Sequence, residues 1–323
     1  MVKLDLKDRK ILYQLDLDAR QSFTQIGKKV GLKKDVVAYR VQRMQDEGII
    51  KNFWTAINTF KLGYNVFRIY INFQFVSSDK KIEIIQYFVN HKNSWAVVSV
   101  KGEIDLNVIL WVKDIYEFYC FWEKTIELYG DYFANSAISI LVYVNAYQKS
   151  YLLLDKSEKS DRLLYQTTCG GESIEIDKID YQLLNEIAVN ARAPLVGLAE
   201  KLGCSSQTIN YRIKTLMQNG AIQAFRVGID ISKLGLEKFV LNVFLREPKQ
   251  KNSLINYLQN LPSLEYIDMA IGWTDLTLEV ILKDVSELTQ IMDQISSKYP
   301  NAIKKQNLMI ATQYHKERWL PEF

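Results

Sequence analysis

Apolar residues recur at intervals of three and four positions through the first part of the chain, which is the spacing of helices with one buried face. Leu12 and Leu15 mark a first helix, which we expect to begin near Asp5 or Asp8. A second helix is expected over residues 22–30. The pattern therefore predicts a helical start to the chain.

A third helix follows a tight turn at Gly31. Val37, Val41 and Met44 form its buried face, and Gly48 ends it. A helix, a tight turn with glycine and a second helix make up the helix-turn-helix pattern. The extended segment that comes next, residues 50–57, is suited to pair as a wing.

Further along the chain the hydrophobic period changes from helical spacing to alternation. The order of segments is strand, helix, strand, strand, helix, strand, which predicts a ferredoxin-like βαββαβ unit. Several strands are apolar on both faces, so we expect the open face of the sheet to pack on another sheet. The segments are VFRIYINFQFV, a helix over 80–91, WAVVSV, LNVILWV, a helix over 114–128 and SAISILVYV.

The chain repeats this whole pattern. Positions 4–67 match positions 176–239 without a gap, with 17 identities in 64. Beyond them the match continues at a slightly shorter offset, at which Gly102 aligns with Gly272. Two copies of one unit could supply the partner sheet to each other.

The predicted fold class is therefore α+β, with two copies of a winged helix-turn-helix domain followed by a ferredoxin-like domain. A polar segment joins the copies, and we interpret it as a linker. The predicted boundaries are 1–60 and 173–232 for the helix-turn-helix domains, 61–145 and 233–323 for the ferredoxin-like domains, and 146–172 for the linker.

Composition excludes several classes of protein. Of 323 residues, 48% are hydrophobic and 24% charged, and no apolar run is long enough for a membrane helix. The charged start lacks a signal-peptide core, so we expect a cytoplasmic protein. Cys120, Cys169 and Cys204 are too far apart for metal-ligand spacing, and His91 and His315 are the sole histidines. We expect no cofactor, no metal, no membrane partner and no enzymatic activity.

The net charge of +4 is unevenly distributed. The segment 1–60 holds 12 Lys and Arg against 7 Asp and Glu. In the second copy, no acidic residue occurs between Lys201 and Ile229, a stretch that contains four basic residues. A patterned basic surface suits a polyanion, whereas the alternative is a chance cluster on a solvated face.

The chain order and the stretch LGCSSQTINYRIKTLMQNGAI, followed by a Lys-Leu-Gly run, resemble the Lrp/AsnC family of prokaryotic transcription regulators. The resemblance covers nearly the whole chain twice. It implies double-stranded promoter DNA as a partner, association with the nucleoid, and sheets of two units packed back to back. One chain would then act as a pseudo-dimer, with further homo-oligomers as an open alternative.

The resemblance also implies an amino acid or similar small effector near the Gly-x-x-Asp turn between the middle two strands. An aromatic residue commonly precedes that Asp in the family, but Ile104 and Thr274 stand there in this chain. Alternatively, the turn is only a tight connection. The effector-site residues implied are Gly102, Asp105, Gly272 and Asp275.

The third helix of each unit is the expected recognition helix, whose exposed side chains would enter the major groove. We predict that Lys33, Lys34 and Arg43 mainly contact the DNA backbone. In contrast, Gln207, Asn210 and Arg212 are predicted to read more of the sequence. The predicted DNA-binding residues are Lys33, Lys34, Tyr39, Arg40, Arg43, Ser205, Ser206, Gln207, Asn210, Tyr211, Arg212 and Lys214.

Each of these assignments has a structural alternative. Arg40 and Arg212 could pair with acids inside the fold. Tyr39 and Tyr211 could be packing residues, and Asp35 could simply cap its helix. The tryptophans are expected in the core rather than in a ligand cage: Trp95, Trp111, Trp122 and Trp273.

Two other functions compete with DNA binding. The sirohaem decarboxylases resemble this chain in architecture, but their chemistry relies on histidine and arginine. The stretch from Asn93 to Asp105 contains no histidine, and His91 alone lies nearby. The other alternative is a metabolite sensor that has lost DNA binding, against which the basic recognition faces argue.

Overall fold

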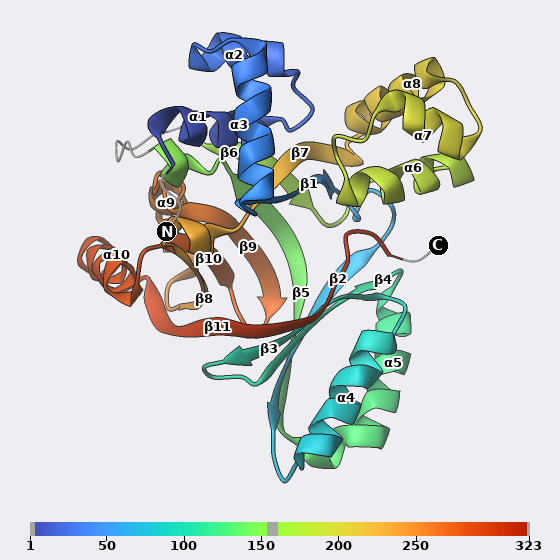
Figure 1. Ribbon diagram of the computed structural model, residues 1–323. Helices are drawn as coiled ribbons and strands as arrows, with labels where there is room; N and C mark the ends of the chain where they lie inside the picture. The colour runs from blue at the N-terminus through green and yellow to red at the C-terminus, as the bar shows by residue number, and fades with distance from the viewer. Residues whose placement is uncertain (1–3, 154–160, 322–323) are drawn as a thin grey trace.

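The computed structural model describes residues 4–153 and 161–321. Both predicted units are present, in the predicted order (Figure 1). The first consists of α1 (Leu6–Leu17), α2 (Phe23–Val30), α3 (Lys34–Asp46), β1 (Ile50–Ile57), β2 (Asn65–Phe73), α4 (Ser78–Asn90), β3 (Ser94–Lys101), β4 (Leu106–Val112), α5 (Ile115–Tyr129), the 3-10 helix η1 (Gly130–Tyr132) and β5 (Phe133–Tyr147).

A connector and the second unit follow. The connector contains η2 (Ser150–Leu153) and β6 (Leu163–Thr168). The second unit consists of α6 (Lys178–Val189), α7 (Leu195–Leu202), α8 (Ser206–Gln218), β7 (Ile222–Ile229), η3 (Ile231–Leu234), β8 (Glu237–Leu245), η4 (Pro248–Gln250), α9 (Lys251–Leu258), β9 (Leu264–Gly272), β10 (Leu276–Leu282), α10 (Val285–Lys298) and β11 (Ile303–Glu317).

The two helix-turn-helix units are joined by their wings. The predicted wing strand β1 pairs antiparallel with β7 of the other unit. Trp54 pairs with Arg226, which is its own counterpart in the second copy, so a local two-fold axis passes through this pair. Each wing packs under the first helix of the opposite unit, and the apolar residues of both units form one core.

Hydrogen bonds between the helix-turn-helix units are reciprocal. The backbone N–H of Ala19 donates to the Phe225 carbonyl at 2.8 Å, and its counterpart Ala191 donates to the Phe53 carbonyl at 2.8 Å. Arg20 binds the carbonyl of Ala191 at 2.6 Å, and Arg192 binds the carbonyl of Ala19. The two-fold relation therefore extends from the wings to the ends of α1 and α6.

The two ferredoxin-like sheets also join to each other. Within the described residues the strand order is β2-β4-β3-β11-β8-β10-β9-β5, and an additional pairing of β2 with β5 closes these strands into a barrel. The junctions are equivalent. Val144 pairs with Asp268 at one, and their counterparts Tyr314 and Val98 pair at the other. The end of β5 extends beyond this ring and pairs with β6.

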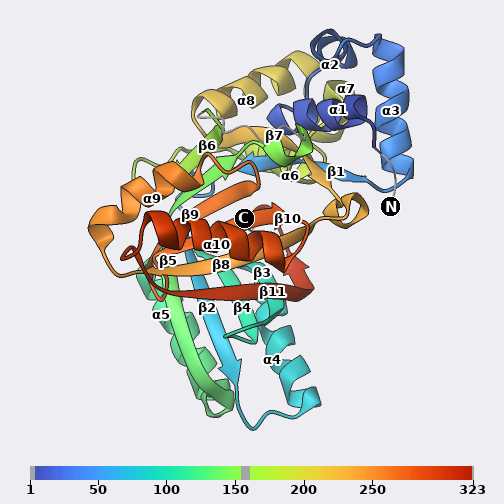
Figure 2. The ribbon, with the colours of Figure 1, turned by 90° about the vertical axis from the view of Figure 1, so that its left-hand side faces the viewer.

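Each sheet has helices on its outer face and the other sheet on its inner face (Figure 2). Separate apolar cores lie under α4 and α5 and under α9 and α10. A further cluster inside the barrel contains Tyr70, Val98 and Met309, from both units. The prediction that the repeats cover each other's open sheet faces is confirmed, but the sheets join at their edges as well as facing each other.

The tryptophans expected in the core do pack against other side chains. Trp111 is buried and stacks on Trp95, with ring centroids 5.3 Å apart. Trp122 stacks on Phe133, and Trp273 lies against Tyr70 inside the barrel.

The described part of the expected linker is folded onto the molecule. Arg162, at its centre, is buried and donates hydrogen bonds to carbonyls that follow α9, including those of Pro262 and Leu264. Residues 154–160 of the predicted linker lie outside the described residues. In the part of the chain that the structure describes, no helix has the length and apolar character needed to cross a membrane.

Candidate nucleic-acid interface

The recognition helices α3 and α8 are built by matching local signals. Gly31 and Gly203 end the preceding helices in the left-handed conformation, at φ +68° and +66°, which glycine adopts without steric penalty. Ser205 then caps α8 by accepting from the backbone N–H of Thr208. In Figure 1, α3 and α8 lie at the end of the molecule opposite α4 and α5.

Most of the predicted DNA-binding side chains are exposed on these two helices. Tyr39 and Tyr211 are each 68% exposed, so the alternative that they are packing residues is wrong. Asp35 is also exposed, in the first turn of α3, where the helix dipole favours a negative charge. The other predicted DNA-binding residues that are exposed are Lys33, Lys34, Ser205, Gln207 and Lys214, and Ser206 and Asn210 are half-buried.

Arg40 does not lie free on the recognition surface. Its guanidinium binds Asp5 at 2.7 Å and Asp8 at 2.8 Å, and these carboxylates flank the start of α1. The Asp5 and Asp8 hydrogen bonds raise the pKa of Arg40. Arg43 binds Asp8 as well, at 2.7 Å. These contacts hold α3 against α1.

Arg212 repeats the arrangement on α8. It binds Asp177 and Asp180 at 2.8 Å each, at the start of α6. The Asp180 hydrogen bond is the main cause that raises the pKa of Arg212. The alternative that both arginines pair with acids inside the fold is therefore correct, and our assignment of Arg212 to sequence reading is corrected: in this structure it positions α8.

The sequence did contain a signal for these ion pairs. Asp5 and Asp8 align with Asp177 and Asp180 in the repeat, just as Arg40 aligns with its counterpart. An acid pair and a base retained together in both copies indicate an interaction within each unit. Gln207 and Asn210, by contrast, replace Asp35 and Ala38, so the outward positions differ between the copies.

The Gly-x-x-Asp turns lie where the two sheets join. Gly102 has φ +140°, and a Cβ there would collide with the Leu308 carbonyl on β11. Gly272 has φ +125°, and a Cβ there would collide with the Ile138 carbonyl on β5. Glycine is thus required at both positions for close backbone approach between the units.

The aspartates of these turns also have structural partners. Asp105 accepts from the backbone N–H of Phe73 at 2.9 Å, and Asp275 accepts from that of Leu245 at 2.8 Å. The alternative that these residues fix a tight connection therefore has direct support. Effector binding by them stays a prediction.

Buried ion pairs between the units are functional contacts that no sequence pattern predicts. Arg226 on β7 and Asp16 on α1 are fully buried and joined by two hydrogen bonds of 2.9 and 3.0 Å. Burial alone would lower the pKa of Arg226, but the Asp16 carboxylate raises it well above its usual value. Inside the barrel, Arg68 on β2 pairs with Asp268 on β9. The two residues of each pair lie about 200 positions apart in the sequence, so no local pattern predicts the pairs.

A third buried pair joins the connector to the barrel. Lys149 binds Glu265 on β9, and both side chains are buried. Burial alone would raise the pKa of Glu265, but Lys149, Lys238 and Arg226 lower it to about 2. Among the described residues, no group of His, Cys, Asp and Glu is placed to hold a metal ion.

This geometry defines a class: a duplicated winged helix-turn-helix protein. A family model for winged helix-turn-helix DNA-binding domains matches residues 4–51 and again 176–223. The proline dehydrogenase transcriptional activator of Rhodobacter capsulatus is 30% identical over 129 residues, which is 39% of this chain and 84% of that protein. The HTH-type transcriptional regulator Ptr1 of Methanocaldococcus jannaschii is 33% identical over 117 residues, or 36% of this chain and 79% of that protein.

The chain belongs to the Lrp/AsnC family of helix-turn-helix transcriptional regulators and carries the family's unit twice. Its whole-chain arrangement is similar to the crystal structure of the siroheme decarboxylase NirDL, with a TM-score of 0.65 and 13% identity. That match covers 96% of this chain and 92% of NirDL, and at this identity it concerns the fold alone.

Proposed function

We propose that this protein is a sequence-specific transcription regulator in which a single chain binds DNA as a pseudo-dimer. The observation that carries the proposal is the reciprocal joining of the two helix-turn-helix units. Trp54 pairs with its own counterpart Arg226 in the wings, and this places α3 and α8 about one local two-fold axis. Two recognition helices related in this way would read half-sites about one helical turn of DNA apart.

The two half-sites are proposed to differ. On α3 the exposed side chains include Lys33 and Lys34, which suit phosphates. On α8 they include Gln207, and Asn210 lies half-buried beside it; an amide side chain can make two hydrogen bonds to adenine. Tyr211 and its counterpart Tyr39 could donate to a phosphate from either helix.

Buried charges support an obligatory pairing of unlike halves. Arg226 has Trp54 as its counterpart, and Asp16 has Ala188. If the second units of two chains paired with each other, Arg226 would face Ala188 in place of Asp16. It would then be a buried charge without a partner, which is strongly destabilising. The fixed pairing of unlike halves would give the protein one orientation on an asymmetric operator.

We include in the proposal that a small effector, such as an amino acid, modulates DNA binding. The turns at Gly102 and Gly272 lie at junctions between the units. A ligand there would have to bind beside these junctions, and it would act by changing how the two sheets meet.

The test is binding of the purified full chain to genomic DNA fragments at increasing salt. We expect affinity to fall steeply, with a log–log slope that grows by about 0.9 for each phosphate neutralised. Failure to retain any DNA at low salt would refute the proposal and favour a metabolite sensor without DNA binding.

We also propose that the chain is not a decarboxylase. His91 has a pKa lowered by burial and by Lys316, and its Nδ1 accepts from the backbone of Asn93 at 3.3 Å. His315 lies on β11 and contacts Ser99 at 2.8 Å, with a pKa also lowered by burial. Incubation with sirohaem is expected to give no spectral change, and turnover would contradict the proposal.

A further inference from the structure

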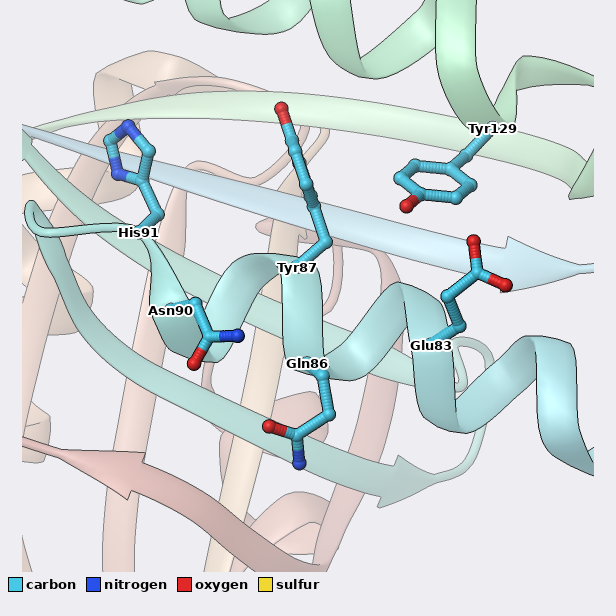
Figure 3. Close-up of a pocket in the computed structure, with 6 residues that line it drawn as sticks. All are labelled: Glu83, Gln86, Tyr87, Asn90, His91 and Tyr129. Atoms are coloured by element: carbon cyan, nitrogen blue, oxygen red, sulfur yellow. The ribbon is translucent and has the colours of Figure 1, made fainter.

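A pocket of about 490 Å³ opens on the outer face of the first ferredoxin-like domain, between α4 and the end of α5 (Figure 3). In Figure 1, α4 and α5 lie at the end of the molecule opposite the recognition helices α3 and α8. The lining of the pocket consists of Glu83, Gln86, Tyr87, Asn90, His91 and Tyr129.

The pocket contains an aromatic corner with one carboxylate beside it. The rings of Tyr87 and Tyr129 meet edge to face, with centroids 5.3 Å apart. The hydroxyl of Tyr87 lies 3.1 Å from the Thr125 hydroxyl on α5, which fixes the ring. Figure 3 shows Glu83 and Tyr129 together at one end of the pocket and His91 at the other.

The second unit contains the same tyrosine pair, and there a lysine of the chain lies against one of the two rings. Tyr257 and Tyr299 are the counterparts in that unit, with centroids 5.9 Å apart. The ammonium of Lys298 lies over the Tyr257 ring, 4.5 Å from its centroid. A cation over a tyrosine face is an attractive arrangement.

In the first unit, no side chain plays the role of Lys298 among the residues that the structure describes around the pocket. Its counterpart is Leu128, which is 48% exposed. The counterpart of Glu83 in the second unit is Ser253, so a negative charge stands next to the open tyrosine corner and not next to the filled one. Both differences favour a cation that comes from outside the chain.

We propose that this pocket binds the ammonium group of a small organic amine, held between the Glu83 carboxylate and the tyrosine rings. The site is independent of DNA binding and of the turns at Gly102 and Gly272. Lys80 pairs with Glu83 at 2.6 Å and lies over the Tyr132 ring, 5.6 Å from its centroid. The pair joins neighbouring turns of one helix and is partly exposed, so it is weak, and a ligand ammonium would have to displace Lys80 from the carboxylate. An amine that also reaches a tyrosine face therefore competes for Glu83.

The test is a titration of the full chain with n-butylamine, observed by NMR of ¹³C-labelled tyrosine rings. Tyr87 and Tyr129 signals are assigned by phenylalanine substitution. We expect saturable shifts of both signals at millimolar amine, and none with n-butanol, which has the same chain without the charge. Equal shifts with butanol would overturn the proposal.

Four variants distinguish a specific binding site from a depression that binds nothing. Leu128→Lys supplies the internal cation that the second unit has and should abolish the amine-dependent shifts, whereas Leu128→Met should keep them. Glu83→Gln should weaken binding about tenfold, since a charge-assisted hydrogen bond is lost. Lys80→Ala should strengthen binding. Undiminished binding by both Leu128→Lys and Glu83→Gln would refute the site.

Discussion

Replacing Asp16 with asparagine should loosen the joint between the two helix-turn-helix units more than any change on the DNA-binding surface. Asp16 on α1 belongs to the first unit, and Arg226 on β7 belongs to the second. Both are fully buried, and Arg226 lies at the centre of the wing pairing. The change leaves the size of the side chain almost unaltered, removes its charge and replaces one of the two accepting oxygens with an NH2 donor.

The expected magnitude follows from what Arg226 retains. It keeps the Tyr266 hydroxyl at 2.8 Å and the Tyr147 carbonyl at 3.1 Å, but both acceptors are neutral. A buried charge that loses its partner destabilises a fold by about 3–5 kcal/mol. Amide exchange in β1 and β7, which reports the opening of this ladder, should therefore accelerate roughly 100- to 4,000-fold.

The measurement is hydrogen exchange by mass spectrometry on peptides covering β1 and β7. Peptides from α4 and α5 serve as an internal reference and should change little. The double variant Asp16→Leu with Arg226→Met removes both charges and should restore most of the protection, because apolar side chains of similar size replace a buried pair well. Acceleration of less than about tenfold in Asp16→Asn would refute the reasoning.

Three further predictions address the barrel and the recognition helices. Because the folded-state pKa of Glu265 is lowered to about 2, its ionised carboxylate stabilises the fold above the unfolded pKa of about 4.3, and this stabilisation is lost as the pH falls from there towards about 2. Acid unfolding followed by circular dichroism should therefore show a shallower loss of stability in Glu265→Gln than in the unchanged protein. Gly102→Ala and Gly272→Ala should each destabilise the protein by about 1–3 kcal/mol in urea unfolding, and unchanged stability would remove the close-approach argument. Arg212→Ala should weaken binding to all DNA sequences alike, whereas Asn210→Ala should relax preference at one base pair, as measured by binding selection from random DNA.

Element types were predictable because each segment has a clear period and the repeat doubles the evidence. LNVILWV corresponds to β4, with the same ends as predicted. The last strand extends to Glu317, where its final residues pair with β3 of the other unit. Local sequence cannot show a partner strand that lies so far away along the chain.

The same limit explains the predictions about individual site residues. Exposure of Tyr39 and Tyr211 followed from their position on the outer face of an amphipathic helix. The role of Arg212 could be inferred only by comparing the two copies, because within one copy an outward basic residue on a recognition helix looks alike whether it binds DNA or an aspartate. The buried pairs of Arg226 and Arg68 depend on the closed arrangement of the two units, which no local pattern encodes.

The central claim is that one chain places two unlike recognition helices on one operator. Its most direct test is hydroxyl-radical footprinting of the highest-affinity genomic site, combined with native mass spectrometry of the complex. We predict one chain per site and two protected half-sites of different sequence, about one helical turn apart. Two chains on a perfectly palindromic site would contradict the account, because like units from different chains would then be paired on the DNA.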